Sequence, residues 1–257
     1  MKNFTALALE GFPLVKSGDD VAELIFETAK KNDLTIENRD VIVVAQKIFS
    51  KAEGREIRLK DVASSPKAKK IAKIARKSPK FVELVLKEAR RILKASRDIL
   101  LVEDKRGLVC INSGIDKSNV EGRGNFALLP ENPDASAEKC RMEIKKLTGK
   151  NVAVIICDTF SRPFRRGQVN FAIGLAGIKP FKDYRGKKDM FGYVLKVKNV
   201  AVVDEIAASA ELLMGQGKEA VPVVIFRGSN GIVEFCEKCN SDELRITEEE
   251  DLFRNTL

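Results

Sequence analysis

Residues 151–168, NVAVIICDTFSRPFRRGQ, join an apolar run to a cluster of polar and basic side chains. The apolar part predicts a buried strand that ends at Asp158. Asp158 and Thr159 then lead into a loop with three arginines: Arg162, Arg165 and Arg166. Carboxylate and hydroxyl oxygens beside guanidinium groups are the parts that hold a divalent cation and a polyphosphate together.

The chain contains no histidine, the side chain that most often moves protons near neutral pH. Any catalysis therefore depends on carboxylates, hydroxyls, amines, thiols or a bound metal ion. The sequence also lacks a GxxxxGK[ST] loop, and the GxG at residues 215–217 is too little for a dinucleotide fingerprint. A bound nucleotide would have to be held in a less common way.

The 257 residues, 44% of them hydrophobic, are enough for one large or two smaller globular domains. No run approaches the roughly 20 apolar residues of a membrane span, and the first residues do not form a secretory signal, so we expect a cytoplasmic protein. The net charge of +9 favours anionic partners. Much of it lies in residues 66–80, a helical pattern that suits either a solvated helix face or a contact with RNA or DNA.

Five cysteines without a secretion signal predict free thiols in a reducing compartment. Cys110, Cys140 and Cys157 stand in apolar patterns and are expected in the core. Cys236 and Cys239 form a lone CEKC, which is either half of a zinc site or a pair in a loop.

Strands and helices do not alternate regularly along the chain, which argues against a simple doubly wound sheet. Strands are predicted at 40–45 and 221–226, and a hairpin at 99–112 that turns at 105–107. The segment 66–96 is predicted to be helical, with an apolar stripe that runs on to Ile92 and Leu93.

Two further helices are predicted in the second half. One follows the Pro-rich residues 128–136, with Asp134 or Ser136 as its cap, and ends at Gly149. The other spans 203–214. The fold class is therefore α+β, with mixed sheets and flanking helices, and the Pro-rich connection divides an N-terminal lobe, 1–130, from a C-terminal lobe, 131–257.

Two loops offer oxygen ligands at predicted strand exits. GIDKSN, residues 114–119, supplies Asp116, Ser118 and Asn119, although its composition is also that of an ordinary turn. For Asp158 the alternatives are a cap or an ion pair with Arg162. A third loop, residues 46–55, places Lys47 and Lys51 four residues apart, as a phosphate site or an amphipathic surface turn would.

Taken in order, several segments of the chain resemble the coenzyme F420-0:L-glutamate ligase family. They are GFPLV (11–15), VVAQKIFSKAEGR (43–55), the GID..SN loop, LLPENPDASA (128–137), CDTFSRPFRRGQ (157–168), AIGLAGIKPFKDYRGKKDMFG (172–192), VDEIAASAELLMGQG (203–217) and PVVIFRG (222–228). Ser161 departs from the DT.GR pattern, where a glycine is expected, and the segment from Ser229 has no counterpart in the pattern.

The resemblance implies a GTP-dependent, amide-forming ligase that adds glutamate to the phospholactyl or glutamyl tail of a deazaflavin coenzyme precursor through an acyl phosphate. It also implies two Mg²⁺ or Mn²⁺ ions per subunit, a supporting K⁺ ion, and an intertwined homodimer of two interleaved lobes. Chemistry of this kind needs positioning and charge neutralisation more than a histidine. The same machinery acting on a different acceptor remains an alternative, as does a basic nucleic-acid-binding protein.

Carried over by position, the resemblance assigns residues to nucleotide and metal. The GTP contacts would be Phe12, Pro13, Leu14, Val15, Gln46, Lys47, Lys51, Asn119, Met214, Gly215, Gln216, Gly217, Lys218, Glu219, Ala220 and Val221. The metal shell would be Asp116, Asp158, Thr159 and Gln216, with Asp116 and Asp158 as the catalytic residues. Our own candidates for binding the negative groups of the acceptor or of glutamate are Arg162, Arg165 and Arg166.

Overall fold

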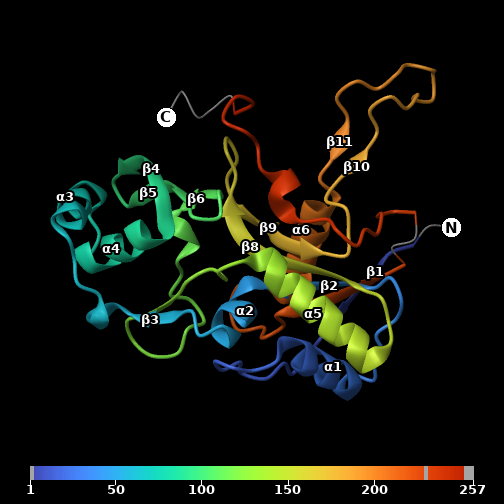
Figure 1. Cartoon of the computed structure of the whole chain (residues 1–257), viewed down its shortest axis with the longest axis horizontal. Coiled ribbons are helices and arrows are strands. Elements are labelled where there is room, and N and C mark those ends of the chain that lie inside the picture. The colour runs from blue at the N-terminus through green and yellow to red at the C-terminus, as the bar shows by residue number, and fades with distance from the viewer. Residues whose placement is uncertain (1–2, 229–230, 252–257) are drawn as a thin grey trace. The chain divides into compact units, whose positions relative to one another are not determined.

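The computed structural model describes residues 3–228 and 231–251, and its architecture is mixed α+β, as predicted (Figure 1). The chain forms two compact units, each built from three stretches. Unit 1 comprises Met1–Val15, Asp19–Phe49 and Asn132–Leu244, and unit 2 comprises Lys16–Gly18, Ser50–Glu131 and Arg245–Leu257. The predicted interleaved lobes, the lobe boundary at residue 130 and the homodimer stay predictions.

Unit 1 contains a five-stranded sheet in the order β1-β12-β2-β8-β9. Its strands are β1 (Thr5–Ala8), β12 (Val223–Arg227), β2 (Val41–Ala45), β8 (Ala153–Ser161) and β9 (Gln168–Ala176). β2 and β8 run parallel, and the other neighbours are antiparallel. The sheet is therefore mixed, and the strands predicted at 40–45 and 221–226 are confirmed.

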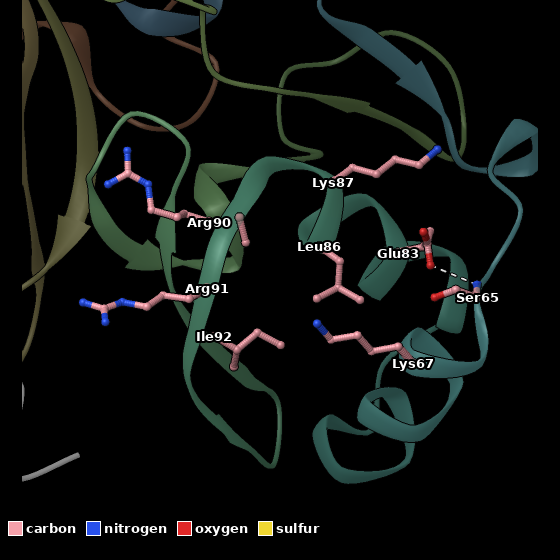
Figure 2. Close-up of a pocket in the computed structure, with 9 residues that line it drawn as sticks. Ser65, Lys67, Glu83, Leu86, Lys87, Arg90, Arg91 and Ile92 are labelled. Atoms are coloured by element: carbon pink, nitrogen blue, oxygen red, sulfur yellow. Dashed lines mark hydrogen bonds between the residues drawn. The ribbon is translucent and has the colours of Figure 1, made fainter.

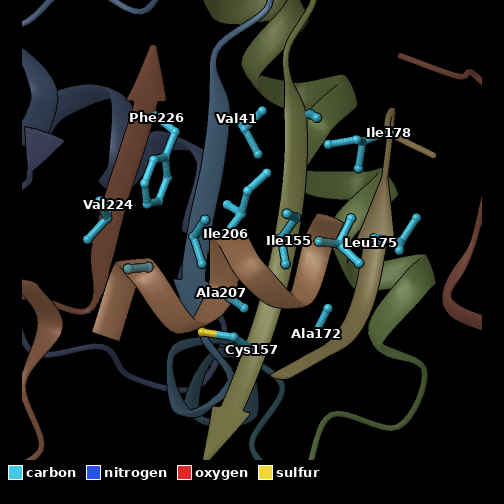
Figure 3. Packing of buried hydrophobic residues seen from close by; sticks show 14 of the residues in the cluster. Val41, Ile155, Cys157, Ala172, Leu175, Ile178, Ile206, Ala207, Val224 and Phe226 are labelled. Carbon is cyan, nitrogen blue, oxygen red and sulfur yellow. The ribbon is translucent and has the colours of Figure 1, made fainter. Parts of the chain in front are cut away.

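Helices cover both faces of this sheet. α6 (Val202–Met214) crosses one face, where Ile206 and Ala207 pack against Ile155, Cys157 and other alternate strand residues (Figure 3). α1 (Val21–Lys31) and α5 (Pro133–Thr148) pack together on the other side. Since β2 and β8 are buried on both faces, they form continuous apolar runs, which is why their sequence is so easily recognised.

α5 begins with a different cap from the one predicted. Asn132 accepts a hydrogen bond from Ala135 N at 3.0 Å, so the prediction of Asp134 or Ser136 as the cap is wrong. Asp134 is engaged elsewhere, because its carboxylate accepts from Leu175 N at 2.8 Å. The predicted end of the helix is confirmed, since Gly149 closes it with a φ of 71°.

The edge strand β9 is covered by three carboxylates from the neighbouring helices. Glu211 and Asp204 of α6 accept from Asn170 N at 2.8 Å and from Ala172 N at 3.0 Å, and Asp134 of α5 accepts from Leu175 N. An uncovered edge would offer these N–H groups to another strand. The three acids thus satisfy the edge and fix both helices against it.

Unit 2 is built around a three-stranded antiparallel sheet, β4 (Ala89–Ser96), β5 (Ile99–Asp104) and β6 (Val109–Ile111). The predicted hairpin is confirmed as β5 and β6. Two helices, α3 (Pro66–Ala75) and α4 (Pro79–Glu88), precede the sheet. A second small pair, β3 (Glu56–Arg58) and β7 (Asn125–Ala127), completes the unit.

The prediction that residues 66–96 are helical throughout is wrong beyond Glu88. Ala89 is already extended, and β4 pairs antiparallel with β5 across a turn in which Asp98 has a φ of 65°. Two register shifts interrupt the pairing and disturb the strict alternation of a strand. The apolar residues Ile92 and Leu93 therefore resembled a continuation of the helical stripe.

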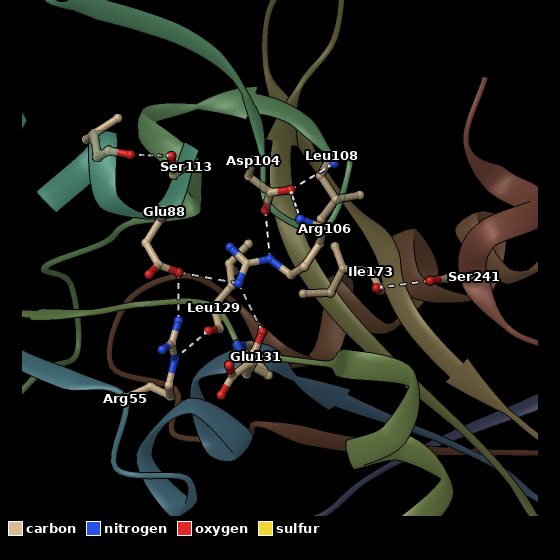
Figure 4. A network of polar contacts seen from close by, with 12 residues as sticks. Arg55, Glu88, Asp104, Arg106, Leu108, Ser113, Leu129, Glu131, Ile173 and Ser241 are labelled. Carbon is tan, nitrogen blue, oxygen red and sulfur yellow. Dashed lines mark hydrogen bonds and ion pairs between the residues drawn. The ribbon is translucent and has the colours of Figure 1, made fainter. Parts of the chain in front are cut away.

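A network of buried polar side chains in unit 2 binds the main chain at Leu129 and Pro130 (Figure 4). Arg106 binds Asp104 at 2.7 Å and donates to Pro130 O at 3.2 Å, while Arg55 binds Glu88 at 2.7 Å and donates to Leu129 O at 3.1 Å. Two guanidinium groups thus hold the main chain of the Pro-rich segment. Arg55, the last residue of the basic segment 46–55, is engaged in this structural contact.

Cys110, Cys140 and Cys157 are buried free thiols, as predicted. Cys236 and Cys239 form a disulfide, so the prediction of five free thiols is wrong for this pair. Their Cα atoms lie 5.8 Å apart, within the usual range for a disulfide. Within residues 3–228 and 231–251, no helix is both long enough and apolar enough to cross a membrane.

The close packing of α5 on β9 predicts that Gly174→Ala destabilises the protein. A methyl group at Gly174 would lie 2.4 Å from Pro133 Cβ and 2.6 Å from Pro133 C, so the helix would have to move. We expect a loss of about 1–3 kcal/mol in the free energy of unfolding, measured by chemical denaturation. Gly149→Ala, which meets nothing within 4 Å, measures the cost of a positive φ alone, and an unchanged stability in Gly174→Ala would contradict the steric account.

Candidate functional site

Asp158 lies inside β8 rather than at its end, so the predicted strand exit at this residue is wrong. β8 continues to Ser161, with Asp158 opposite Phe171 and Ser161 opposite Gln168 of β9. Pairing with β9 extends β8 beyond its apolar residues, and hydrophobicity alone does not predict a strand there. The three arginines Arg162, Arg165 and Arg166 lie in the connection between the two strands.

Two predicted metal-shell residues, Thr159 and Gln216, are in direct contact. Thr159 Oγ1 donates to Asn170 Oδ1 at 2.8 Å and accepts from Gln216 Nε2 at 2.9 Å. Thr159 and Asn170 are cross-strand partners, and Gln216 follows the end of α6 at Gly215. The hairpin and the C-terminal end of α6 therefore meet at this hydroxyl group.

Two members of this cluster were missed by sequence reasoning. Asn170 is buried, with 4% of its surface exposed, and its Nδ2 also donates to Cys157 Sγ at 3.5 Å. Glu211 binds both Asn170 N and the Gln216 amide, the latter at 2.6 Å. The available signal was a carboxylate within the apolar run AELLM, one turn before GQG.

Asp158 leaves β8 on the face opposite to this cluster. Cys157 and Thr159 both contact Asn170, so they share one face, and consecutive strand residues alternate between faces. The side chains of Asp158 and Thr159 thus present their oxygens on the two sides of one strand. The side chains of Thr159 and Gln216 are thus in contact, while the side chain of Asp158 lies on the opposite face of β8.

The Asp116 loop belongs to unit 2 and has the geometry of a turn. The Asp116 carboxylate accepts from Ser118 N at 2.9 Å and from Ser118 Oγ at 2.5 Å, and Asn119 has a φ of 52°. The main chain of Asp116 pairs with Ala127. Whether Asp116 shares an ion with Asp158, a residue of unit 1, stays a prediction.

The predicted nucleotide contacts lie in separate loops, in one short helix and at the end of α6. Phe12–Val15 follow β1, with Leu14 exposed, and α2 (Gln46–Ala52) begins directly after β2 with Gln46 and Lys47 and carries Lys51 near its end. The segment 214–221 turns after α6, where Gly217 N donates to Glu219 Oε2 at 2.8 Å. Ala220 has a φ of 55°, an uncommon conformation that this short turn imposes.

The arginine loop is held by one of its own side chains. Arg162 Nη2 donates to Arg166 O at 2.8 Å, while its Nε is buried and finds no acceptor among the described residues. Arg165 and Arg166 are exposed. The loop therefore presents three guanidinium groups with donors still available for an anion.

A pocket of about 210 Å³ in unit 2 is a separate feature (Figure 2). Leu86, Ile92 and Lys67 point into it, whereas Arg90 and Arg91 extend to the other side of β4, where both bind Glu103. None of the predicted site residues lines it.

The atoms around Thr159 suit a divalent cation. Carboxylate, hydroxyl and amide oxygens are the hard donors that Mg²⁺ and Mn²⁺ prefer. No group of three acidic or cysteine side chains able to hold a metal occurs in the described part of the chain. Mg²⁺ sites commonly use one or two carboxylates and complete the shell with water and substrate phosphates.

Residues 11–228 match the protein family described as F420-0:Gamma-glutamyl ligase. The chain belongs to this ligase family. The coenzyme F420:L-glutamate ligase of Archaeoglobus fulgidus is 47% identical over 249 residues, or 97% of this chain and 96% of that protein. The protein of the same name from Methanothermobacter thermautotrophicus is 45% identical over 86% of this chain and 88% of its own length. The one from Methanocaldococcus jannaschii is 44% identical over 95% of this chain and 94% of its own length.

The family match ends at residue 228, yet the ligase chain continues to pack on unit 1 beyond it. Val233 is buried in the core under α6, and Phe235 pairs with Ile178. Ser241 donates from its N and Oγ to Asp134, at 3.0 and 2.8 Å. Residues 231–244, with the disulfide, are thus an integral part of unit 1, while residues 229–230 and 252–257 lie outside the described residues.

Asp204, which binds α6 to β9 by accepting from Ala172 N, makes the stability of the ligase depend on pH. Burial raises the pKa of Asp204 above its ordinary value of 3.8, and the bond from Ala172 N offsets only part of this effect. A raised pKa means that ionisation is disfavoured in the folded state, so stability falls as the pH rises from about 3.8 through the raised pKa. We expect Asp204→Asn, which can still accept from Ala172 N, to raise Tm at pH 7.

This gain should shrink as the pH is lowered toward 4, because a growing fraction of the wild-type carboxyl is then protonated as well. Thermal unfolding of both proteins between pH 4 and pH 8 measures it. A Tm difference that grows on acidification would contradict the assignment.

Proposed function

We propose that this ligase adds L-glutamate to the carboxylated tail of a coenzyme F420 precursor, converting F420-0 to F420-1 and F420-2, with GTP as the energy source. The observation that carries the proposal is the near-complete coverage by relatives named for coenzyme F420 and L-glutamate. The inventory of the site supports it: hard oxygen donors, a cluster of arginines and no histidine.

The reaction that fits these groups has two steps. A carboxylate oxygen of the acceptor attacks the γ-phosphorus of GTP, so an acyl phosphate forms and GDP leaves. The amine of glutamate then attacks the acyl carbon, phosphate leaves with the bond electrons, and the amine loses its proton to the medium. Both steps depend on orientation and charge neutralisation more than on a proton-shuttling residue.

Mg²⁺ or Mn²⁺ would be held by Asp116, Asp158, Thr159 and Gln216. When bound, such ions neutralise the phosphate oxygens and orient the nucleotide. The position of Asp158 and of the Thr159–Gln216 pair on opposite sides of β8 supports two ion positions rather than one. K⁺ would have a supporting role, for which we assign no residue.

The anionic groups of acceptor and glutamate would bind to the arginine loop. Arg162 has a buried Nε with no acceptor in the described chain, and Arg165 and Arg166 project from the same turn. Forked guanidinium groups recognise carboxylate and phosphate with two parallel hydrogen bonds. The nucleotide would contact the loops after β1 and α6 and the start of α2, with Lys47 and Lys51 near its phosphates, and Asn119 in the Asp116 loop.

A homodimer is supported by an arm of unit 1 between β10 (Lys182–Asp183) and β11 (Asn199–Val200), which projects from the sheet (Figure 1). Main-chain bonds such as Gly186 N to Leu195 O order the arm. Two of its apolar side chains are almost fully exposed, Met190 at 94% and Phe191 at 95%. An ordered arm with an apolar end is suited to packing against a second copy of the chain.

The function is tested by incubating the protein with GTP, Mn²⁺, L-glutamate and F420-0, and following the deazaflavin by mass spectrometry. We expect successive additions of one glutamyl residue and release of GDP. Asp158→Asn and Asp116→Asn should each lower both products by at least about 100-fold, because an amide is a weaker ligand than a carboxylate and cannot neutralise the cation.

Lys188→Ser, a polar change on the arm, is the control for expression and handling. GDP release without glutamyl addition would indicate a different acceptor. Full activity in both aspartate variants would remove the metal assignment.

The role of the arm is tested by Met190→Asp combined with Phe191→Asp. A charged tip cannot be buried against a second subunit, so the variant should elute as a monomer in size-exclusion chromatography with light scattering, while the wild type elutes as a dimer. Lys196→Ser, on the same arm, should leave the dimer intact. A dimeric double variant would show that the arm is not required for association.

A further inference from the structure

We propose that Glu211 is a positioning residue for the cation site: it fixes the side-chain amide of Gln216 so that the amide oxygen faces the ion. The proposal rests on the proposed function, because it assumes that Gln216 contributes to a divalent-cation site. It concerns a residue of α6 that contacts Gln216 but lies outside the predicted metal shell.

The contacts of Gln216 leave its amide only one orientation. Its Nε2 donates to Glu211 Oε1 at 2.6 Å and to Thr159 Oγ1 at 2.9 Å, so both amide hydrogens are used. An ionised carboxylate can only accept hydrogen bonds. If the amide were turned over, its oxygen would face the oxygen of Glu211 and the two would repel.

The consequence is an oriented carbonyl oxygen. With the nitrogen held toward Glu211 and Thr159, Gln216 Oε1 points away from both and is available as a ligand. A neutral amide is by itself a weak substitute for a carboxylate at a cation site. Glu211 compensates in two ways, because it removes the wrong orientation and adds a negative charge one hydrogen bond behind the ligand.

Glu211 is itself held firmly. Its other oxygen, Oε2, accepts from Asn170 N at 2.8 Å on the edge of β9. Asn170 in turn accepts from Thr159 Oγ1, which directs the hydroxyl hydrogen away from the remaining lone pair of Thr159. One carboxylate thus links the strand, the hydroxyl and the amide in a single network.

The competing explanation is that Glu211 only fastens α6 to β9. Asp204 provides a matched control, because it lies on the same helix two turns earlier and accepts from Ala172 N at 3.0 Å. It makes the same kind of contact to the same strand, but within the described chain it bonds to neither Thr159 nor Gln216. A purely structural role would affect both positions alike.

The test measures Mn²⁺ binding to the full chain in the presence of GDP, using the electron paramagnetic resonance signal of free Mn²⁺. We expect Glu211→Gln to raise the Kd for Mn²⁺ by about 10- to 100-fold, as loss of an outer partner of a metal ligand usually does. Asp204→Asn should leave this Kd unchanged. Glu211→Asp, which keeps an acceptor-only carboxylate, should recover part of the affinity.

A second variant separates orientation from fold. In Gln216→Glu the ligand has two equivalent oxygens, so no orientation remains to be fixed. Adding Glu211→Gln to this background should cost little, because it removes a like charge as well as a contact, and the double variant should bind Mn²⁺ within about threefold of wild type. Thermal unfolding of every variant shows whether it is folded at the temperature of the assay.

The outcomes are distinct. If the wild type binds Mn²⁺ and Glu211→Gln binds it equally well, the positioning role is wrong and the proposed function is untouched. The positioning role is also wrong if Gln216→Ala has no effect, or if the loss in Glu211→Gln persists in full in the double variant. If the wild type with GDP binds no Mn²⁺, the metal part of the proposed function fails, and this inference fails with it.

Discussion

The attachment of α6 to the edge strand β9 is the constraint on which unit 1 depends. Asp204 and Glu211, two helical turns apart, accept hydrogen bonds from main-chain N–H groups two residues apart in the strand. These bonds satisfy an edge that would otherwise be open, and they set the helix at one register along the sheet. Since Gly215 ends α6 immediately beyond the second attachment, the position of the following loop is set as well.

The same attachment places chemically useful atoms. Thr159 and Asn170 are cross-strand partners at the polar end of the β8–β9 pair, and Gln216 contacts Thr159 while Glu211 accepts from both Gln216 and Asn170 N. The apolar part of the sheet is thus buried between helices, and its polar end holds the hydroxyl and amide groups that we propose as metal ligands. Burial raises the pKa of the neighbouring Cys157 thiol, which disfavours the thiolate form there.

The sequence predicts those parts of the fold whose signal is local. β2, β12 and α6 follow from continuous or periodic apolar runs, and Gly149 follows from the need for a positive φ at a helix end. β4 could not be predicted in this way, because its pairing with β5 and its two register shifts are tertiary features. The cap of α5 was missed because Asp134 is occupied by Leu175 and Ser241, residues distant in the sequence.

The candidate site shows the same division between local and tertiary signals. Asp158, Thr159 and Gln216 stand out as polar residues beside apolar runs. Glu211 resembles any solvent-facing acid of an amphipathic helix until the strand that it binds is known.

The distribution of charge decides how anionic substrates would be attracted. Residues 60–98 hold 13 of the 46 basic residues but only 4 of the 37 acidic ones, which accounts for the whole net charge of +9. This segment forms α3, α4 and β4 of unit 2, and the rest of the chain carries equal numbers of both signs. The net charge therefore says little about unit 1, where attraction must come from individual groups. Nearby charges act strongly only within about 10 Å at moderate salt, so the arginine loop and bound cations would have to supply it.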